Sequence, residues 1–215
     1  MAGKLKVGVL ASGGGTNLQS IIDNCRTGRI DAEVAVVISD VQCHALERAR
    51  EAGIPEHWLN RHDRQRFPTR ESFDRAVLER LEQHEVELVC LAGYLRIMTT
   101  ELVGAYSGRM MNTHPALLPA FGGAGMWGHH VHEAVLEYGC KVSGCTIHFV
   151  SLETDAGPIV LQRAVPVEED DTPETLAARI LPHEHELYSE AIQLFAEGRL
   201  RIEGRRVRIH PTKCP

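Results

Sequence analysis

Val7-Gly8-Val9-Leu10-Ala11 runs directly into Ser12-Gly13-Gly14-Gly15-Thr16-Asn17, and this junction decides the fold. A short apolar run enters a glycine loop, and apolar residues then recur at helical spacing until Gly28. This order predicts a buried strand, a tight loop and a helix. Glycines at such a junction expose backbone N–H groups beside a helix N-terminus, where an anion binds readily. The junction therefore favours a ligand that carries a phosphate.

The glycine pattern limits which phosphate ligands fit. The loop is not GxxxxGK[ST], and GxGxxG fails because Leu18 stands where the third glycine belongs. ATP and dinucleotides are therefore weakly supported. Two interpretations of the loop alone stay open: a phosphate-monoester site, or a tight turn without a ligand.

Strand and helix patterns alternate through the first half of the chain, which implies parallel strands with crossover helices. Strands are expected at 7–11, 32–39, 56–59 and 88–92, with helices at 17–25, 45–52 and 70–84. In the less regular second half, we expect strands at 109–113, 142–150 and 159–167, the last two antiparallel, and a short helix at 131–137. A long helix should follow the N-cap Thr172, with Pro182 kinking or splitting it, and 201–209 should form an edge strand. The fold class is α/β, with a mostly parallel central sheet, helices on both faces and an antiparallel extension in the C-terminal half.

Composition excludes several classes of protein. The chain has 215 residues, 43% hydrophobic and 24% charged, which is ordinary for a globular domain. A net charge of -6 argues against a dedicated nucleic-acid binder. No apolar run approaches the roughly 20 residues that span a bilayer, and no signal peptide is visible. Six scattered cysteines without a C-x-x-C pair, at 25, 43, 90, 140, 145 and 214, indicate reduced thiols in a cytoplasmic protein.

Three polar side chains in the second half belong to motifs whose proline or glycine restricts the backbone. They are Asn112 and His114 in Asn-Thr-His-Pro, and Asp155 in Asp-Ala-Gly-Pro. Asn112 and His114 are two apart at a strand end, so both side chains point the same way. A carboxamide can donate to an oxyanion, an imidazole can donate or shuttle a proton, and a carboxylate can orient the imidazole. The trio is suited to acyl transfer without a metal or a covalent nucleophile.

Simpler interpretations of these residues remain open at this point. A strand-end histidine is often structural, and Asp155 can be a turn residue. His129, His130 and His132 could form a zinc site with Asp155, but a mobile, partly exposed histidine cluster is the favoured interpretation. His148 is expected near the trio, as a supporting or a packing residue.

Four motifs in order resemble the phosphoribosylglycinamide formyltransferase family. They are the 12–17 loop, Leu-Ala-Gly-Tyr-Leu-Arg-Ile-Met at 91–98, Asn-Thr-His-Pro-Ala-Leu-Leu-Pro at 112–119 and Asp-Ala-Gly-Pro at 155–158. The resemblance covers residues 4 to about 200. It implies a Rossmann-like formyltransferase fold, and transfer of a formyl group from 10-formyltetrahydrofolate to the amine of glycinamide ribonucleotide in purine synthesis. It also implies one domain over 1–200, with a phosphate-binding half at 1–108, a catalytic and folate-binding half at 109–200, and a tail at 201–215.

The resemblance assigns roles to particular residues. Asn112, His114 and Asp155 match the family's catalytic residues, and Asn112 also faces the folate. Glu184 matches a carboxylate that helps to bind the ribonucleotide, the alternative being a solvated helix charge. Arg70 matches a residue near the glutamyl or benzoyl end of the folate, the alternative being a surface arginine at a helix start. The matches to the phosphate loop are Gly15, Thr16 and Asn17, and those to the folate-binding segment are Leu95, Arg96, Ile97 and Met98.

The chain departs from the family pattern after 112–119. The family has a short aromatic-Pro-Gly turn there, whereas this chain has a longer loop at 121–128 without the proline. Pro182 lies less than one helical turn before Glu184, which makes the placement of that carboxylate uncertain. No metal is implied, and a monomer and a homodimer are both compatible with the sequence.

Three other functions compete with the implied one. A formyltetrahydrofolate hydrolase would use the same trio with water in place of the amine. A methionyl-tRNA formyltransferase would need a C-terminal RNA-binding domain, for which the tail is too short. A noncatalytic phosphate- or nucleotide-binding protein predicts that Asn112, His114 and Asp155 do not converge.

Overall fold

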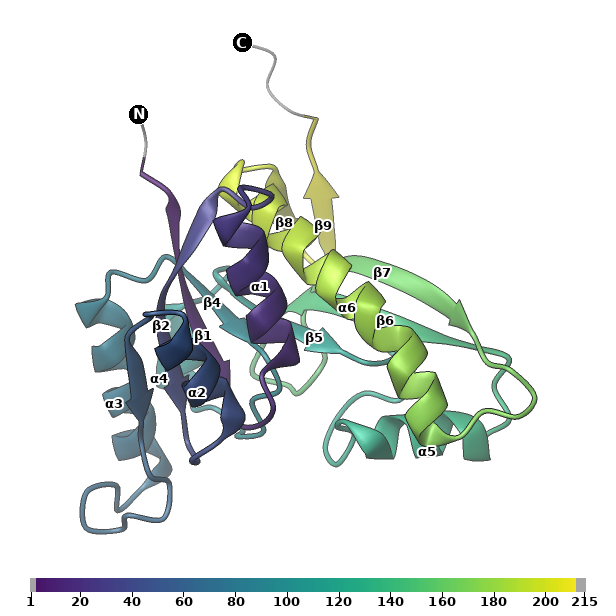
Figure 1. Cartoon of the computed structure of the whole chain (residues 1–215), viewed down its shortest axis with the longest axis horizontal. Coiled ribbons are helices and arrows are strands. Elements are labelled where there is room, and N and C mark those ends of the chain that lie inside the picture. Colours follow the sequence, from purple (N-terminus) through teal and green to yellow (C-terminus); the bar gives the residue numbers. More distant parts are fainter. Residues whose placement is uncertain (1–2, 212–215) are drawn as a thin grey trace. The chain divides into compact units, whose positions relative to one another are not determined.

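The structure is a computed structural model that describes residues 3–211. It divides into two compact units, Met1–Met111 and Asn112–Pro215. Each unit is built from strands and helices of its own, and the strand β5 (Met110–His114) crosses from one unit into the other. Figure 1 labels these elements along the chain.

The first unit is a parallel sheet with the strand order β3-β2-β1-β4. Its apolar strands pair in parallel because helices connect them, and Figure 1 shows α1 and α2 in front of these strands and α3 and α4 behind them. The strands are β1 (Leu5–Ala11), β2 (Ala32–Ser39), β3 (Glu56–Trp58) and β4 (Leu88–Leu91). The helices are α1 (Thr16–Arg26), α2 (His44–Glu51), α3 (Arg70–Gln83) and α4 (Thr100–Ala105).

Two local features explain how α3 is placed. Thr69 caps the helix by accepting a hydrogen bond from the Ser72 N–H, and the Ser72 hydroxyl accepts from the Thr69 N–H in return. Gly8 of β1 lies against the same helix, since a Cβ there would stand 2.7 Å from Leu81 Cδ2. A side chain at position 8 would therefore require the Leu81 side chain to shift.

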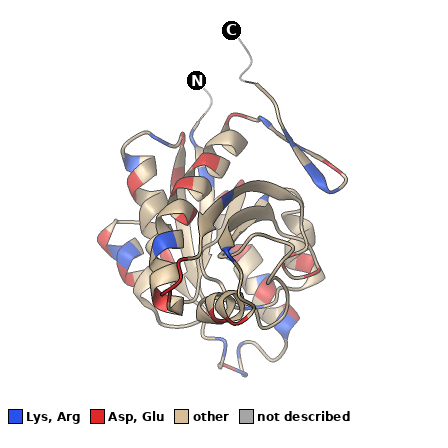
Figure 2. Ribbon diagram, turned by 90° about the vertical axis from the view of Figure 1, so that its right-hand side faces the viewer, with Lys and Arg blue, Asp and Glu red and all other residues tan. Residues whose placement is uncertain are grey.

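The second unit is built around the antiparallel pair of β6 (Val142–Phe149) and β7 (Ile159–Pro166). A hairpin of β8 (Leu200–Glu203) and β9 (Arg206–Ile209) joins β7 through a parallel pairing of Ile159 with Arg206. Both α5 (His129–Glu137) and α6 (Pro173–Ala196) belong to this unit, and α6 packs on β6, β7 and α5. The hairpin carries most of the basic residues near the C-terminus, which are blue in Figure 2.

Helix α6 corrects the expectation for Pro182. Thr172 caps the helix and Pro173 opens it, as predicted. However, the helix runs without a break from Pro173 to Ala196, so a split at Pro182 is wrong, whereas the expected kink stays a prediction. Proline removes one N–H donor from a helix, but the apolar residues that α6 buries on both sides of position 182, among them Ile180 and Leu187, keep it packed.

The other differences concern short elements. The predicted edge strand at 201–209 is instead a hairpin, because Gly204 adopts a φ of 61° and reverses the chain. The six-residue helix α4 was not predicted, since it is too short to show a periodicity. The α/β fold class, the parallel first half and the antiparallel β6–β7 pair are confirmed. The division into domains stays a prediction, and Cys214 and the end of the tail lie outside the described residues.

Within residues 3–211, none of the helices combines the length and the apolar character that crossing a membrane requires.

The loop before α6 generates a stability prediction. Asp171 accepts hydrogen bonds from both terminal nitrogens of Arg179, each at 2.6 Å, and its side chain is 2% exposed. These bonds hold the pKa of Asp171 well below its usual range. Because the folded-state pKa is depressed, the carboxylate stabilises the fold above about pH 4, and this stabilisation is lost as the pH falls toward the folded-state value.

We therefore expect Asp171→Asn to lower the free energy of unfolding by about 1–2 kcal/mol at pH 7. Urea denaturation of both proteins between pH 7 and pH 2 measures the difference, which should shrink as the wild-type carboxylate is protonated. Asp170→Asn, at an exposed neighbour, is the matched control and should change little. A difference that stays constant down to pH 2 would contradict the assignment.

Candidate functional site

Asn112 lies on β5 and is oriented by a histidine on β6. Its amide Nδ2 is 3.3 Å from His148 Nε2. The other ring nitrogen of His148 lies 3.0 Å from the Phe149 carbonyl oxygen, which can only accept, so the ring proton is on Nδ1. Burial lowers the pKa of His148 and favours the neutral ring. His148 Nε2 therefore accepts a hydrogen bond from the Asn112 amide. Asn112 accordingly turns its NH₂ group, rather than its oxygen, toward the imidazole.

His114 ends β5 and is held from two sides. Its Nε2 donates to the Phe121 carbonyl oxygen at 2.8 Å, and its Nδ1 lies 3.6 Å from Asp155 Oδ2. The side chain is 4% exposed. The ring and the carboxylate are therefore closer than one bridging water would place them.

Asp155 stands between the two imidazoles. Its Oδ2 faces His114 and accepts the Gly123 N–H at 3.0 Å, while its Oδ1 lies 3.7 Å from His148 Nε2. The backbone at Asp155 has a φ of 55°, which is rare for a residue with a side chain. Asn112, His114, Asp155 and His148 thus form one polar cluster in the second unit, in which the two histidines are buried and the other two side chains are partly buried.

The glycines beside Asp155 allow the backbone to come close. A Cβ at Gly157 would stand 1.7 Å from the Phe149 carbonyl oxygen, and one at Gly122 would stand 3.2 Å from Asp155 Cβ. Phe121, in the loop that departs from the family pattern, has a φ of 54°. The carbonyl oxygen of this residue accepts the hydrogen bond from His114 Nε2. The Asp-Ala-Gly-Pro motif is therefore a close backbone contact as well as the source of a carboxylate.

Glu184 lies on α6 and is buried, with 7% of its surface exposed. Its Oε1 accepts a hydrogen bond from the Thr113 hydroxyl at 3.1 Å. The alternative of a solvated helix charge is therefore wrong. Thr113 lies between Asn112 and His114, so Glu184 is connected to the same strand end, and Pro182 does not displace it.

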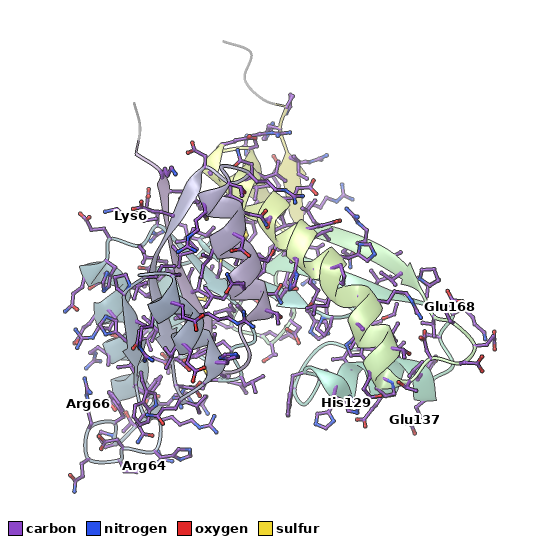
Figure 3. All side chains as sticks on the ribbon, viewed as in Figure 1. Lys6, Arg64, Arg66, His129, Glu137 and Glu168 are labelled. Atoms are coloured by element: carbon purple, nitrogen blue, oxygen red, sulfur yellow. The ribbon has the colours of Figure 1, made fainter. Side chains whose placement is uncertain are left out.

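The histidines at the start of α5 separate into two kinds. His129, labelled in Figure 3, pairs with Glu133 at 3.1 Å and Glu174 at 3.7 Å, and His130 pairs with Glu133. His132 is buried, which lowers its pKa, so the cluster is exposed only in part, as expected. No group of three or more histidine, cysteine or acidic side chains among residues 3–211 is arranged to hold a metal ion. The zinc alternative therefore has no ligand set in the described chain.

In the first unit, Gly15, Thr16 and Asn17 lie where β1 turns into α1. Gly15 has a φ of 71°, and a Cβ there would stand 2.9 Å from the backbone of Ala45. Two loop carbonyls are turned toward α2: Gly13 accepts the Ala45 N–H at 3.1 Å and Gly14 accepts Arg48 Nε at 2.8 Å. At the Gly15 cap, within the described residues, no side chain satisfies the first N–H groups of α1. This geometry suits an anion.

The segment 95–98 also belongs to the first unit and follows β4. Leu95 and Ile97 are about half exposed, while the Arg96 guanidinium lies 3.9 Å from the centroid of the Phe73 ring. Arg70 is exposed at the first position of α3, and Met98 is half-buried. The structure therefore connects Asn112, His114, Asp155 and Glu184 in one unit, and places the loop and segment residues in the other.

The sequence did not reveal two contributors to the cluster. The Phe121 carbonyl is a backbone group, which every residue type has, so the sequence does not distinguish it. Thr113 lies between two singled-out residues, but a hydroxyl there carries no signal of a distant carboxylate. His148 was expected near the trio without a defined role, and its contact with Asn112 now supplies one.

Comparisons with known proteins agree on one family. The "Formyl transferase" family matches residues 5–192. The chain is 40% identical to phosphoribosylglycinamide formyltransferase of Escherichia coli K12 over 199 residues, which is 92% of this chain and 90% of that protein. It is 43% identical over 200 residues to the trifunctional purine biosynthetic protein adenosine-3 of Bos taurus, of whose length it spans 19%.

Solved structures are similar as well. Glycinamide ribonucleotide transformylase 1 from Symbiobacterium toebii superposes with a TM-score of 0.90 at 53% identity, over 97% of this chain and 95% of that one. A formyltetrahydrofolate deformylase from Pseudomonas syringae has a TM-score of 0.87 at 25% identity, over 98% of this chain and 67% of that one. With the matched region spanning both units and the polar cluster, the chain belongs to the formyl transferase family.

Proposed function

We propose that this protein transfers a formyl group from 10-formyltetrahydrofolate to the amine of glycinamide ribonucleotide, a step in purine biosynthesis. The observation that carries the proposal is the polar cluster that brings together Asn112, His114 and Asp155 through His148. Similarity to phosphoribosylglycinamide formyltransferases over nine-tenths of both chains supports the choice of substrates. The formyl-folate is a co-substrate, and the proposed reaction uses no metal.

Asn112 and His114 stabilise the oxyanion of the tetrahedral intermediate. An amide NH₂ has two N–H groups, so Asn112 can donate one to His148 and the other to the formyl oxygen. The His114 Nε2–H now donates to the Phe121 carbonyl oxygen. In the reaction, this donor exchanges the carbonyl for the formyl oxygen as negative charge develops on it.

Asp155 has two roles in the reaction: it supports His114, and it relays a proton. It lies close enough to His114 Nδ1 to support a positive charge on the ring. It also takes the proton that the attacking amine releases, and passes it through water to the departing folate nitrogen. The amine attacks the formyl carbon directly, so no bond forms between the formyl group and the protein.

The remaining predicted residues bind the two substrates. The 12–17 loop, with Gly15, Thr16 and Asn17, holds the ribonucleotide phosphate, and Glu184 contacts the ribonucleotide. Leu95, Arg96, Ile97 and Met98 receive the pterin, and Arg70 the far end of the folate. These roles belong to a single formyltransferase domain over 1–200 that acts in the cytoplasm, as a monomer or homodimer, without nucleic acid.

Hydrolysis of the formyl-folate is the second candidate, and it is favoured by the likeness to a formyltetrahydrofolate deformylase. It needs the same cluster with water as the attacking group. Formyl transfer is preferred because the formyltransferases match at higher identity, 53% against 25%.

An absorbance assay of formyl-folate consumption separates these two candidates. We expect turnover when glycinamide ribonucleotide is present, and at least about 100-fold slower loss of the formyl group when it is omitted, because binding would hold the amine of the ribonucleotide beside the formyl carbon, an advantage that solvent water lacks. Equal rates with and without the ribonucleotide would establish the hydrolase instead.

Replacing the carboxylate tests the role of Asp155. Asp155→Asn keeps an oxygen that can accept the Gly123 N–H but removes the charge and the proton acceptor. We expect kcat to fall by about 100-fold or more, with the ribonucleotide Kd, measured by calorimetry, unchanged. Asp170→Asn, an exposed carboxylate of the same unit, is the matched control. Retained turnover in Asp155→Asn would remove the assigned role.

A further inference from the structure

Two buried carboxylates of the first unit have no part in the proposed reaction. Asp40 follows β2 and Asp74 lies on α3, and each is 1% exposed. Carboxylates are rarely this buried unless a partner holds them. Their partners lie at opposite ends of the 95–98 segment.

The first end of the segment is held by Ser12. Its hydroxyl donates to Asp40 Oδ1 at 2.6 Å, so its lone pairs are left to accept, and one accepts the Leu95 N–H at 3.2 Å. Asp40 is itself fixed by Arg61, whose Nη1 donates to its Oδ2 at 3.1 Å. The Ser12 backbone N–H also donates to Gly93 at 3.0 Å. The glycine loop and the segment are thus tied at two points.

The other end is held by Asp74. Its Oδ2 accepts the Thr99 backbone N–H at 2.6 Å, immediately after Met98. A backbone N–H can only donate, so a carboxyl oxygen at this position must accept whether or not the acid is ionised. Thr99 is also the N-cap residue of α4, so the same contact sets where the next helix begins.

The middle of the segment rests on the same helix. Arg96 lies over the ring of Phe73, the neighbour of Asp74 on α3. Leu95 and Ile97 point outward, with 50% and 55% of their surface exposed. The segment has no regular secondary structure, so these side-chain contacts, rather than a ladder of backbone bonds, determine its shape.

We propose that Asp40, acting through Ser12, and Asp74 are positioning residues that hold both ends of 95–98 in the conformation that receives the formyl-folate. The inference rests on the proposed function, since it assumes that this segment binds the folate. Neither carboxylate touches the substrate. Each acts by fixing a backbone group, which lowers the ordering cost when the ligand binds.

Asp74 provides the sharpest test. In Asp74→Ala we expect the Thr99 amide to exchange hydrogen faster. We also expect the formyl-folate to bind about tenfold more weakly, with its Kd and its KM both raised, because the buried hydrogen bond that holds the Thr99 backbone is lost. The kcat at saturation and the ribonucleotide KM should stay within about twofold. Asp74→Asn, whose amide oxygen can still accept the Thr99 N–H, should restore the folate affinity.

Asp171→Ala is the matched control. It removes another buried carboxylate, and the contribution of that carboxylate to the free energy of unfolding, while it leaves 95–98 untouched. It should leave the folate Kd unchanged. An unchanged folate Kd in Asp74→Ala, or no rescue by Asp74→Asn, would overturn this inference while the proposed function stands. Wild-type protein that does not bind the formyl-folate in the same calorimetric titration would overturn both.

Discussion

Two backbone carbonyls decide what the candidate site can do. The Phe121 carbonyl oxygen accepts a hydrogen bond from His114 Nε2–H, and the Phe149 carbonyl oxygen accepts one from His148 Nδ1–H. Because a carbonyl oxygen cannot donate, each fixes the position of the proton on a neutral ring. The two neutral rings are therefore different tautomers, with the proton on Nε2 of His114 and on Nδ1 of His148. His114 turns Nδ1 toward Asp155, and His148 turns an accepting Nε2 toward Asn112.

Unusual backbone makes this arrangement possible. Phe121 and Asp155 both adopt a positive φ, which costs of order 1–3 kcal/mol at a residue with a side chain. Gly157 lets the chain approach the Phe149 carbonyl, where a side chain would not fit. Hydrogen bonds hold both residues in place: the Phe121 carbonyl oxygen accepts from His114, and the Asp155 carboxylate accepts from the Gly123 N–H. The strained residues and the chemically active residues are thus neighbours.

Much of the fold was predictable because it depends on local patterns. The short apolar runs of β1, β2 and β4, and the caps Thr69 and Thr172, are signals that a few neighbouring residues carry. Pro182 does not split α6, because packing along the helix outweighs one missing hydrogen bond. The hairpin of β8 and β9 was missed because the turn at Gly204 interrupts a run that otherwise reads as one strand.

The candidate site was predictable to a different extent. Asn112, His114 and Asp155 could be singled out because each residue type suits acyl chemistry and lies within three residues of a proline or a glycine. Their supporting contacts could not, because the Phe121 carbonyl, the Thr113–Glu184 hydrogen bond and the Ser12–Asp40 pair join residues that only the folded chain brings together.

The positions of the two imidazole protons test the account most directly. Nitrogen NMR of protein labelled with ¹⁵N-histidine, with His114→Asn and His148→Asn to assign the signals, reports which ring nitrogen carries the proton. In the neutral state, we expect the proton on Nε2 of His114 and on Nδ1 of His148. A proton on Nδ1 of His114, or on Nε2 of His148, would contradict the arrangement from which the proposed mechanism follows.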